Sequence, residues 1–486
     1  SAADPARAIY DVTGLGEQRS ETHRAALDRA WRLVLLNQFH DIIPGSSIHW
    51  VYQDSARDYE TIRQLGESVR DSALCTLEAL VDTSGFKQPV LIANTVGIRR
   101  REIIELSAGV LASVDVPPFG YVAVEKNAEF LQTTDDPVKA TESRQGITME
   151  NGLVRVKINA KGHLTSIFDL PARREVLSGQ GNMFHLHQDI PNSWDAWDVD
   201  IFYKERCDVI EGLEKLELVE LGPLRAAARI VRVFGKSRIE QRIVLYAGSP
   251  RIDFPTEVEW REDQKLLKVA FPVNIYAQKA TYEVQFGHLE RANHANTSWD
   301  MGKFEVCAQK WANLSEAGYG VALLNDCKYG HDIQGNIIRL SLLRAPGSPD
   351  PLADRGRHQF SYALLPHTGD LRHVIDQAYS MNVPLLVRDL KPGEGSLPAS
   401  HSFFLTDRPG AVVETIKVAE DGAAIIVRLY ESEGGRGPLT LTTTLPVRKA
   451  WLASLLETEQ KSLSIKNGSV RLDLKPFEIV TIKYAL

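Results

Sequence analysis

NQFHDIIPGSS, at residues 37–47, joins two segments of helical periodicity and decides how the first part of this chain folds. Residues 21–40 place apolar side chains on one side of a predicted helix, and residues 47–82 repeat them at alternating spacings of four and three. The Pro-Gly pair at 44–45 makes the turn, and one of the two serines that follow caps the second helix. The sequence therefore predicts an antiparallel helical hairpin or bundle whose apolar stripe packs in a core.

Beyond about residue 85 the pattern changes from helical to β. Short alternating segments rich in β-branched and aromatic residues are separated by Gly, Pro, Asn and Asp. The clearest of these predicted strands are Pro89–Asn94, Leu153–Asn159, Leu224–Phe234, Ile239–Tyr246, Arg251–Trp260, Val321–Asn325, Ile337–Leu343 and Ala423–Tyr430. One further helix is expected near residues 371–380. The predicted fold class is mainly β, with an N-terminal helical hairpin and several antiparallel β-sandwich domains.

Two polar stretches, residues 125–144 and 388–400, read as linkers between these parts. They divide the chain into four predicted domains: a helical domain at 1–85, a small β segment at 86–126, a large β-sandwich domain at 140–390 and a C-terminal β-sandwich domain at 400–486.

Composition narrows the classes of function. The 486 residues carry a net charge of −7, with 43% hydrophobic and 24% charged residues, which is ordinary for a globular protein. No excess of basic residues favours nucleic acid or an anionic membrane, and no apolar run approaches the roughly 20 residues that span a bilayer. The four cysteines are scattered without a C-x-x-C pair. This argues against a disulfide framework or a thiolate zinc site and favours a reducing cytoplasm. Because the chain has neither an initiator Met nor a signal peptide pattern, we expect a processed chain or a piece of a longer one.

The His40-Asp41 pair at the predicted turn is the first candidate site. An imidazole is a common zinc ligand, and a neighbouring carboxylate binds a substrate hydroxyl or orients another ligand. The Pro-Gly turn would hold both rigidly. The alternative is structural, since a histidine at the C-terminal end of a helix is favourable through the helix dipole alone.

Two further candidates lie in the β region. Alternate residues of a strand share a face, so His185, His187 and Asp189 form a possible metal cluster. The WDAWD run at 194–198 places two aromatic rings among carboxylates and resembles a sugar-binding surface. The edge of a β sandwich explains the same run without any ligand.

Arg344 and the segment 287–300 are the remaining candidates. Arg344 stands where a strand gives way to a Pro-rich loop, so it either reaches into a cleft or forms a surface ion pair. The polar segment 287–300 reads as a long loop. The sequence contains no P-loop, no G-x-G-x-x-G after a strand, no G-x-S-x-G elbow and no H-E-x-x-H.

The run LNQFHDIIPGSS at 36–47 closely resembles the helical-domain signature of glycoside hydrolase family 38 α-mannosidases. The likeness extends over nearly all 486 residues and is strongest to the bacterial and cytosolic branch of that family. The other motifs that carry it are Glu150–Leu153, Lys161–Asp169, Trp194–Asp198, Leu266–Pro272, Gly287–Asp300, Ser341–Arg344 and Asp354–Gly356.

The resemblance implies that the catalytic groups and the remaining domains lie in different parts of the family members. Family members begin with a large α/β catalytic domain that carries an H-x-D zinc pair and an aspartate nucleophile. The only H-x-D of this chain, His187 to Asp189, lies in the β region and does not match that motif. The chain thus resembles the C-terminal half of an α-mannosidase, with a large sandwich similar to galactose mutarotase. Carried over by position, His40 is a zinc ligand, Asp41 contacts mannose hydroxyls and Arg344 lies at the edge of the cleft.

The reaction that the resemblance implies is retaining hydrolysis of α-mannosides, assisted by zinc. We expect no catalytic nucleophile in this chain, and we expect the isolated chain to be inactive and to bind zinc poorly, because one histidine cannot hold the ion. The expected partners are α-mannoside oligosaccharides and the catalytic domain, with no nucleic acid and no membrane; homo-oligomerisation stays open. Two alternatives stand beside this interpretation. One is a non-catalytic carbohydrate-binding or structural β-sandwich protein, and the other is an unrelated sugar-active enzyme that uses Asp195 and Asp198.

Overall fold

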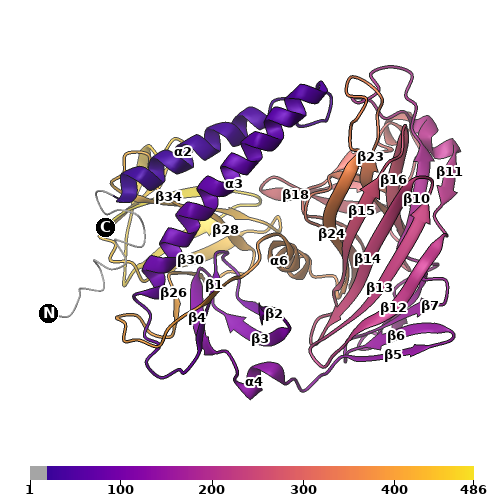
Figure 1. Ribbon diagram of the computed structural model, residues 1–486. Helices are drawn as coiled ribbons and strands as arrows, with labels where there is room; N and C mark the ends of the chain where they lie inside the picture. Colours follow the sequence, from indigo (N-terminus) through magenta and orange to yellow (C-terminus); the bar gives the residue numbers. More distant parts are fainter. Residues whose placement is uncertain (1–18) are drawn as a thin grey trace. The chain divides into compact units, whose positions relative to one another are not determined.

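The computed structural model describes residues 19–486, which form two compact units (Figure 1). Of these residues, unit 1 contains 19–38, 54–131 and 383–486. Unit 2 contains residues 39–53 and 132–382. The chain therefore enters unit 2 twice, first for the short segment around the predicted turn and then for the large β region.

The helical hairpin consists of α2 (Arg19–Asn37) and α3 (His49–Glu78), which run side by side in Figure 1. The buried Asn37 side chain links them, because its Nδ2 donates to Leu33 O at 2.9 Å and to Asp58 Oδ2 at 3.1 Å. Gly66 lowers helical propensity but does not interrupt α3. The predicted hairpin is confirmed.

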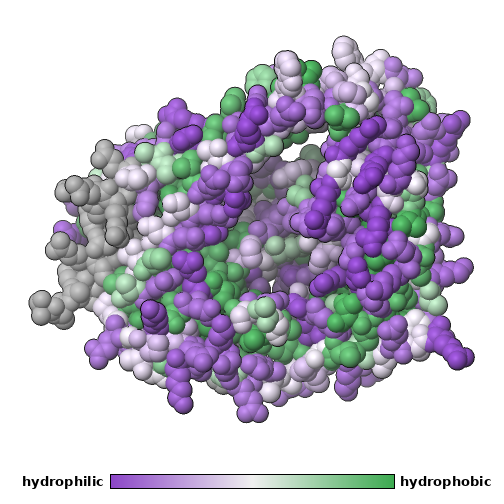
Figure 2. All heavy atoms as spheres, viewed as in Figure 1, coloured by the Kyte–Doolittle hydropathy of each residue, from purple (hydrophilic) through white to green (hydrophobic). Residues whose placement is uncertain are grey.

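The prediction that the whole apolar stripe packs in a core is wrong. Only Leu74 and Leu77 of α3 are buried, and they pack in a cluster with residues of β1 and β4. Farther from this cluster Ile62 and Val69 are half-buried, and Trp31 and Tyr59 are 62% and 46% exposed. Helical periodicity predicts which side of a helix is apolar but not which element packs against it. Here the sheet that contains β1 and β4 packs only against the last turns of α3. Figure 2 shows hydrophobic and hydrophilic residues side by side on the visible surface.

Unit 1 also holds the small β segment and the C-terminal sandwich. All of its strand pairs are antiparallel, and the isolated bridge between Val81 and Leu397 is parallel. The first sheet has the order β25-β1-β4-β26, beside the hairpin β2-β3, and the sandwich stacks the sheets β28-β29-β34-β31-β32 and β27-β30-β33 around one apolar core. The strands are β1 (Pro89–Asn94), β2 (Arg100–Ser107), β3 (Val110–Val116), β4 (Gly120–Glu125), β25 (Leu386–Asp389), β26 (Ser400–Ser402), β27 (Phe404–Thr406), β28 (Ala411–Val418), β29 (Ile425–Glu431), β30 (Gly437–Thr443), β31 (Lys449–Ala453), β32 (Glu459–Leu463), β33 (Ser469–Leu474) and β34 (Ile479–Ala485).

Unit 2 is built on three sheets with the orders β12-β13-β14-β15-β24-β21-β20-β17-β18, β11-β10-β16-β23-β22-β19 and β5-β6-β7-β8-β9. Their strands are β5 (Lys139–Ser143), β6 (Gly146–Glu150), β7 (Val154–Asn159), β8 (Leu164–Asp169), β9 (Arg174–Glu175), β10 (Met183–Gln188), β11 (Cys207–Val209), β12 (Leu213–Leu221), β13 (Arg225–Phe234), β14 (Ser237–Tyr246), β15 (Ile252–Trp260), β16 (Lys265–Pro272), β17 (Lys279–Val284), β18 (Gly287–Ala292), β19 (Val306–Cys307), β20 (Trp311–Glu316), β21 (Tyr319–Asn325), β22 (Gly330–Gln334), β23 (Ile337–Arg344) and β24 (Gly356–His367). The shorter elements of unit 2 are η1 (Ile201–Glu205), α5 (Ser298–Met301) and α6 (Leu371–Asn382), and α4 (Glu129–Gln132) lies at the boundary with unit 1. The mainly β fold class with antiparallel sheets is confirmed.

Three segments differ from their predictions. The polar stretch 125–144 is not a plain linker, because β5 pairs with β6 along five residues. Half of the predicted loop 287–300 is strand β18, whose exposed polar residues suit an edge strand, and Thr297 then caps α5. The third difference concerns the end of the large domain: β25 pairs with β1, so the chain leaves unit 2 at Asn382, before residue 390.

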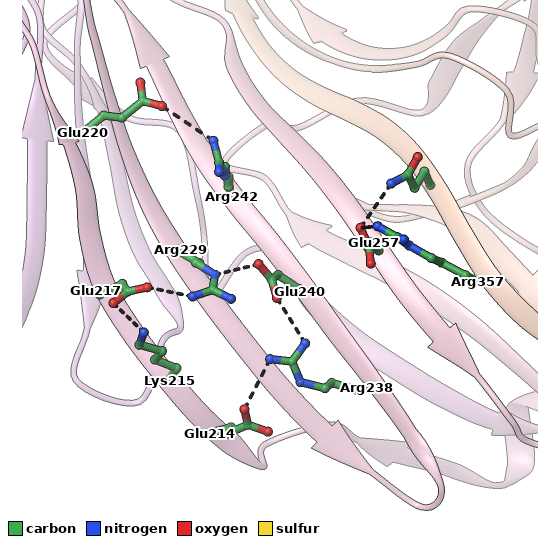
Figure 3. A network of polar contacts seen from close by, with 11 residues as sticks. Glu214, Lys215, Glu217, Glu220, Arg229, Arg238, Glu240, Arg242, Glu257 and Arg357 are labelled. Carbon is green, nitrogen blue, oxygen red and sulfur yellow. Dashed lines mark hydrogen bonds and ion pairs between the residues drawn. The ribbon is translucent and has the colours of Figure 1, made fainter. Parts of the chain in front are cut away.

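Charged side chains from β12, β13, β14, β15 and β24 form a network on the nine-stranded sheet (Figure 3). Arg229 on β13 pairs with Glu217 at 2.9 Å and with Glu240 at 2.6 Å, and Arg238 reaches Glu240 at 3.1 Å. Opposite charges on neighbouring strands support the register of the sheet. None of these residues was a candidate for function. Pairing of opposite charges on the surface accounts for the network.

Candidate functional site

The turn between α2 and α3 holds the first pair of candidate residues. Ile42 N and Ile43 N both donate to Phe39 O, at 2.8 and 3.0 Å, and Gly45 reverses the chain with a φ of +81°. The Ser47 hydroxyl donates to Asp41 O at 2.6 Å, while the Ser46 hydroxyl has no partner. The two serines therefore do not play the predicted capping role, and Ser47 closes the turn instead.

His40 and Asp41 lie together on this turn. His40 Nε2 is 3.4 Å from Asp41 Oδ2, and the two side chains are 72% and 46% exposed. The His40 ring also lies 4.4 Å from the Phe39 ring, centroid to centroid. Both polar groups are thus held by a short, hydrogen-bonded turn and are open to a ligand.

The tryptophan run meets this turn within unit 2. The Trp197 ring lies edge-on to the His40 ring, with centroids 6.4 Å apart and an angle of 77° between the planes. Trp197 N and Asp198 N both donate to Trp194 O, at 2.7 and 2.9 Å, which curls the run into a compact turn. Two motifs separated by more than 150 residues in the sequence therefore form one surface.

Arg344 anchors the tryptophan run to the end of β23. At the end of β23, its guanidinium bonds to the Asp189 carboxylate and to the backbone oxygens of Ala196, at 3.3 Å, and Asp198. The Arg344 side chain is only 17% exposed. Burial raises the pKa of Asp189, and the Arg344 guanidinium opposes that rise. Arg344 thus positions the loop, and a direct contact with substrate stays a prediction.

Asp195 and Asp198 also act within the loop. Asp195 Oδ2 accepts hydrogen bonds from Gly347 N at 2.6 Å and Ser348 N at 3.2 Å, so it ties the tryptophan run to the segment after β23. Asp198 contributes its backbone oxygen to Arg344. The engaged Asp195 carboxylate weakens the alternative in which these two acids are a catalytic pair.

Sequence reasoning missed His49 and Asp350. His49 Nδ1 lies 3.1 Å from Asp350 Oδ2, and the Asp350 side chain is 4% exposed. This contact fastens the first turn of α3 to the same loop that receives Asp195. Both residues lie beside stretches that the sequence singled out, but a pairing between residues 301 apart gives no signal in a single sequence.

A metal site at the turn is incomplete within residues 19–486. His40 and Asp41 offer two donors, whereas zinc takes three or four protein ligands. The only group of three closely spaced ligand residues in this part of the chain is His185, His187 and Cys207. His40 and Asp41 could therefore form part of a zinc site, but they are too few to hold the ion alone.

Comparison with known proteins identifies the family. The Glycosyl hydrolases family 38 C-terminal domain matches residues 149–352, and the C-terminal beta sandwich domain of the same family matches residues 410–482. The Alpha mannosidase middle domain matches residues 4–77. The chain belongs to glycosyl hydrolase family 38. Within this family 38 chain, the His40 turn lies in the middle-domain match, and the tryptophan run and Arg344 lie in the C-terminal match.

Curated relatives agree with this assignment, and a solved structure shares the fold. The family 38 chain is 40% identical to human Alpha-mannosidase 2C1 over 480 residues, covering 95% of this chain and 46% of the relative. It is 31% identical to an Alpha-mannosidase of Saccharomyces cerevisiae, covering 94% and 43%. The crystal structure of an alpha-mannosidase from Enterococcus faecalis V583 superposes with a TM-score of 0.82 at 18% identity, over 99% of this chain and 65% of that one.

The chain spans about half the length of the curated relatives it matches. The predicted resemblance to family 38 and to the C-terminal part of its members is confirmed. The likeness of the large sandwich to galactose mutarotase stays a prediction. Among residues 19–486, no helix is both long and apolar enough to cross a membrane.

Proposed function

We propose that this chain supplies one wall of the sugar site of an α-mannosidase, in which His40 is a zinc ligand and Asp41 binds mannose hydroxyls. The observation that carries the proposal is the edge-on contact between the His40 and Trp197 rings, with Asp41 3.4 Å from the imidazole. It brings a metal ligand, a carboxylate and an aromatic face onto one exposed surface. The curated relatives named above are alpha-mannosidases, which supports the substrate class.

Each residue of this surface has a distinct task in the proposal. His40 donates a ring-nitrogen lone pair to the ion, and the Asp41 carboxylate accepts hydrogen bonds from sugar hydroxyls. Trp197 packs its apolar face against a sugar ring. Arg344 positions Trp197 through the loop and contacts sugar only at the cleft edge. Zinc, when bound, would supply a positive charge that orients sugar hydroxyls.

The nucleophile and the remaining zinc ligands would come from a part of the parent protein outside this chain. The reaction would then be retaining hydrolysis through a covalent glycosyl-enzyme intermediate. The scattered cysteines favour a cytoplasmic enzyme that acts on α-mannoside oligosaccharides. The isolated chain would be inactive on α-mannosides and would not hold zinc at His40.

The test compares the full-length parent protein with its variants. His40→Ala should lose one equivalent of zinc by elemental analysis and lose hydrolysis of an aryl α-mannoside. Asp41→Asn should keep the zinc but raise KM, because a neutral amide is a weaker acceptor for hydroxyls. His23→Ala, on α2 and outside the turn, is the control and should change neither. Full zinc content and activity in His40→Ala would overturn the proposal.

The isolated 486-residue chain tests the non-catalytic alternative. Calorimetric titration with α-mannose oligosaccharides should show no binding in the absence of the catalytic domain. Tight, zinc-independent binding that disappears in Trp197→Ala would instead favour a carbohydrate-binding module.

A further inference from the structure

A second group of metal-binding side chains lies at the edge of the six-stranded sheet of unit 2. His185 and His187 are two residues apart on β10, so they share a face of the strand. The edge strand β11 pairs with β10 in the register that places Cys207 opposite His187. One ligand atom from each of these three residues lies within 4.8 Å of the other two.

The His187 ring is oriented as in a metal site. Its Nδ1 lies 3.2 Å from Tyr203 O, so the ring donates its proton there and leaves a lone pair on Nε2. That Nε2 is buried and has no hydrogen-bond partner, in a residue that is 6% exposed. A buried polar atom without a partner is costly, and ligating histidines usually donate their second nitrogen to a carbonyl in this way.

The other two ligands complete a site with an open position. His185 lies beside His187, with ring centroids 6.1 Å apart, and brings a second imidazole to the group. Cys207 is exposed on the edge strand, which gives an ion a path from solvent. Two imidazoles and one thiolate suit zinc, leave its fourth position for water, and do not suit calcium or magnesium.

The neighbouring charges do not forbid a cation. Lys268 lies opposite His185 on β16 and is fully buried, but its ammonium pairs with Glu305 and lies 3.6 Å from Asp332. Arg339 also pairs with Asp332, at 3.3 Å. Lys204 lies 4.0 Å from the same Asp332 carboxylate, so three cations meet two carboxylates within this group. On binding, the Cys207 thiol gives its proton to the buffer, and the resulting thiolate offsets one charge of the ion.

We propose that His185, His187 and Cys207 form a zinc site on the β10–β11 edge of the large sandwich. Asp189 was the third member of the cluster predicted from the sequence, but its carboxylate pairs with Arg344 instead. The site is independent of His40 and of the proposed mannosidase function. It fastens an edge strand of only three residues to the sheet.

The test uses the metal-free 486-residue chain and zinc titration against a chromogenic chelator. The chain and its His40→Ala and Cys307→Ser variants should bind one equivalent, whereas Cys207→Ser should bind at least tenfold more weakly. Cys307 is the matched control, because it is an exposed cysteine on β19 at the opposite edge of the same sheet. Undiminished binding in Cys207→Ser, or its loss in His40→Ala, would overturn the proposal.

A second measurement needs no variant and so does not depend on folding of a mutant. One equivalent of zinc should slow alkylation of Cys207 at least tenfold, read by peptide mass spectrometry, and leave Cys307 unchanged. Cobalt in place of zinc should produce a thiolate-to-metal absorption band. Equal alkylation rates with and without zinc would refute the site.

Discussion

Replacing Arg344 by methionine should destabilise unit 2 by about 3–5 kcal/mol, the usual cost of removing one partner from a buried ion pair. The Asp189 carboxylate is 2% exposed and would be left without its cation. The backbone oxygens of Ala196 and Asp198 would lose the same donor. Methionine keeps much of the side-chain length, so the loss reports on the guanidinium rather than on volume.

Urea denaturation followed by tryptophan fluorescence measures this change, because Trp194 and Trp197 lie in the loop that Arg344 holds. The control is Arg355→Met. Arg355 pairs with Asp263, but the two side chains are 42% and 59% exposed, so the pair contributes at most about 1 kcal/mol. Equal losses in the two variants would refute the argument that burial makes the Arg344 pair important.

The stability lost in Arg344→Met should depend on pH in a defined direction. The folded pKa of Asp189 is raised above 3.8, so the folded state takes up protons there and stability falls as pH rises through that window. Arg344 lowers this pKa, and its removal raises it further. The stability deficit of Arg344→Met should therefore be larger at pH 7 than below pH 3.8, because both folded proteins hold the pKa of Asp189 above that value. A deficit that does not change with pH would contradict the assignment to Asp189.

Three more substitutions test the turn, the long helix and the charged sheet. Gly45→Ala should cost about 1–2 kcal/mol, because φ is +81° and no atom lies near the added methyl group, so denaturation reports backbone strain alone. Gly66→Ala should stabilise the chain by about 0.5–1 kcal/mol, since it is helical and equally free of neighbours; a loss would mean that α3 needs the glycine. Arg229 lowers the pKa of Glu240 from 4.5 to about 2, so Glu240 stabilises the folded state above pH 4.5 and that contribution is lost as pH falls. Glu240→Gln should therefore flatten the acid limb of the stability curve, and an unchanged limb would contradict this.

The sequence predicted the elements of this fold well because most of its strands are short, alternating and bounded by turn residues. Pro89–Asn94 is β1 to the residue, and the helix expected near 371–380 is α6. Prediction failed where a partner from another part of the chain decides the outcome. Residues 386–389 were placed in the large domain but form β25 on β1, far earlier in the chain, and Trp31 is apolar but stays exposed.

The candidate site was likewise predicted only in part. His40, Asp41 and the tryptophan run could be found because each sits in a local pattern with its own chemistry. Their meeting could not, because a turn at residue 40 and a loop at residue 197 are joined only by the fold of unit 2. Cys207 was dismissed for want of a C-x-x-C pair, since the register of β11 on β10, and not sequence spacing, brings it to His187.

The anchoring of the tryptophan run gives the strongest reason to regard the surface around His40 as built for a ligand. A mobile loop with exposed aromatic rings would lose entropy on binding, and that loss would offset the contact energy. Here Arg344 and Asp195 hold the loop from two sides with their own charged groups. Two buried or partly buried charges are a costly way to fix a loop that has no task, because an apolar contact would stabilise it equally well. The arrangement holds Trp197 beside His40 without a ligand, and in the proposed function this would preorganise the site for a sugar.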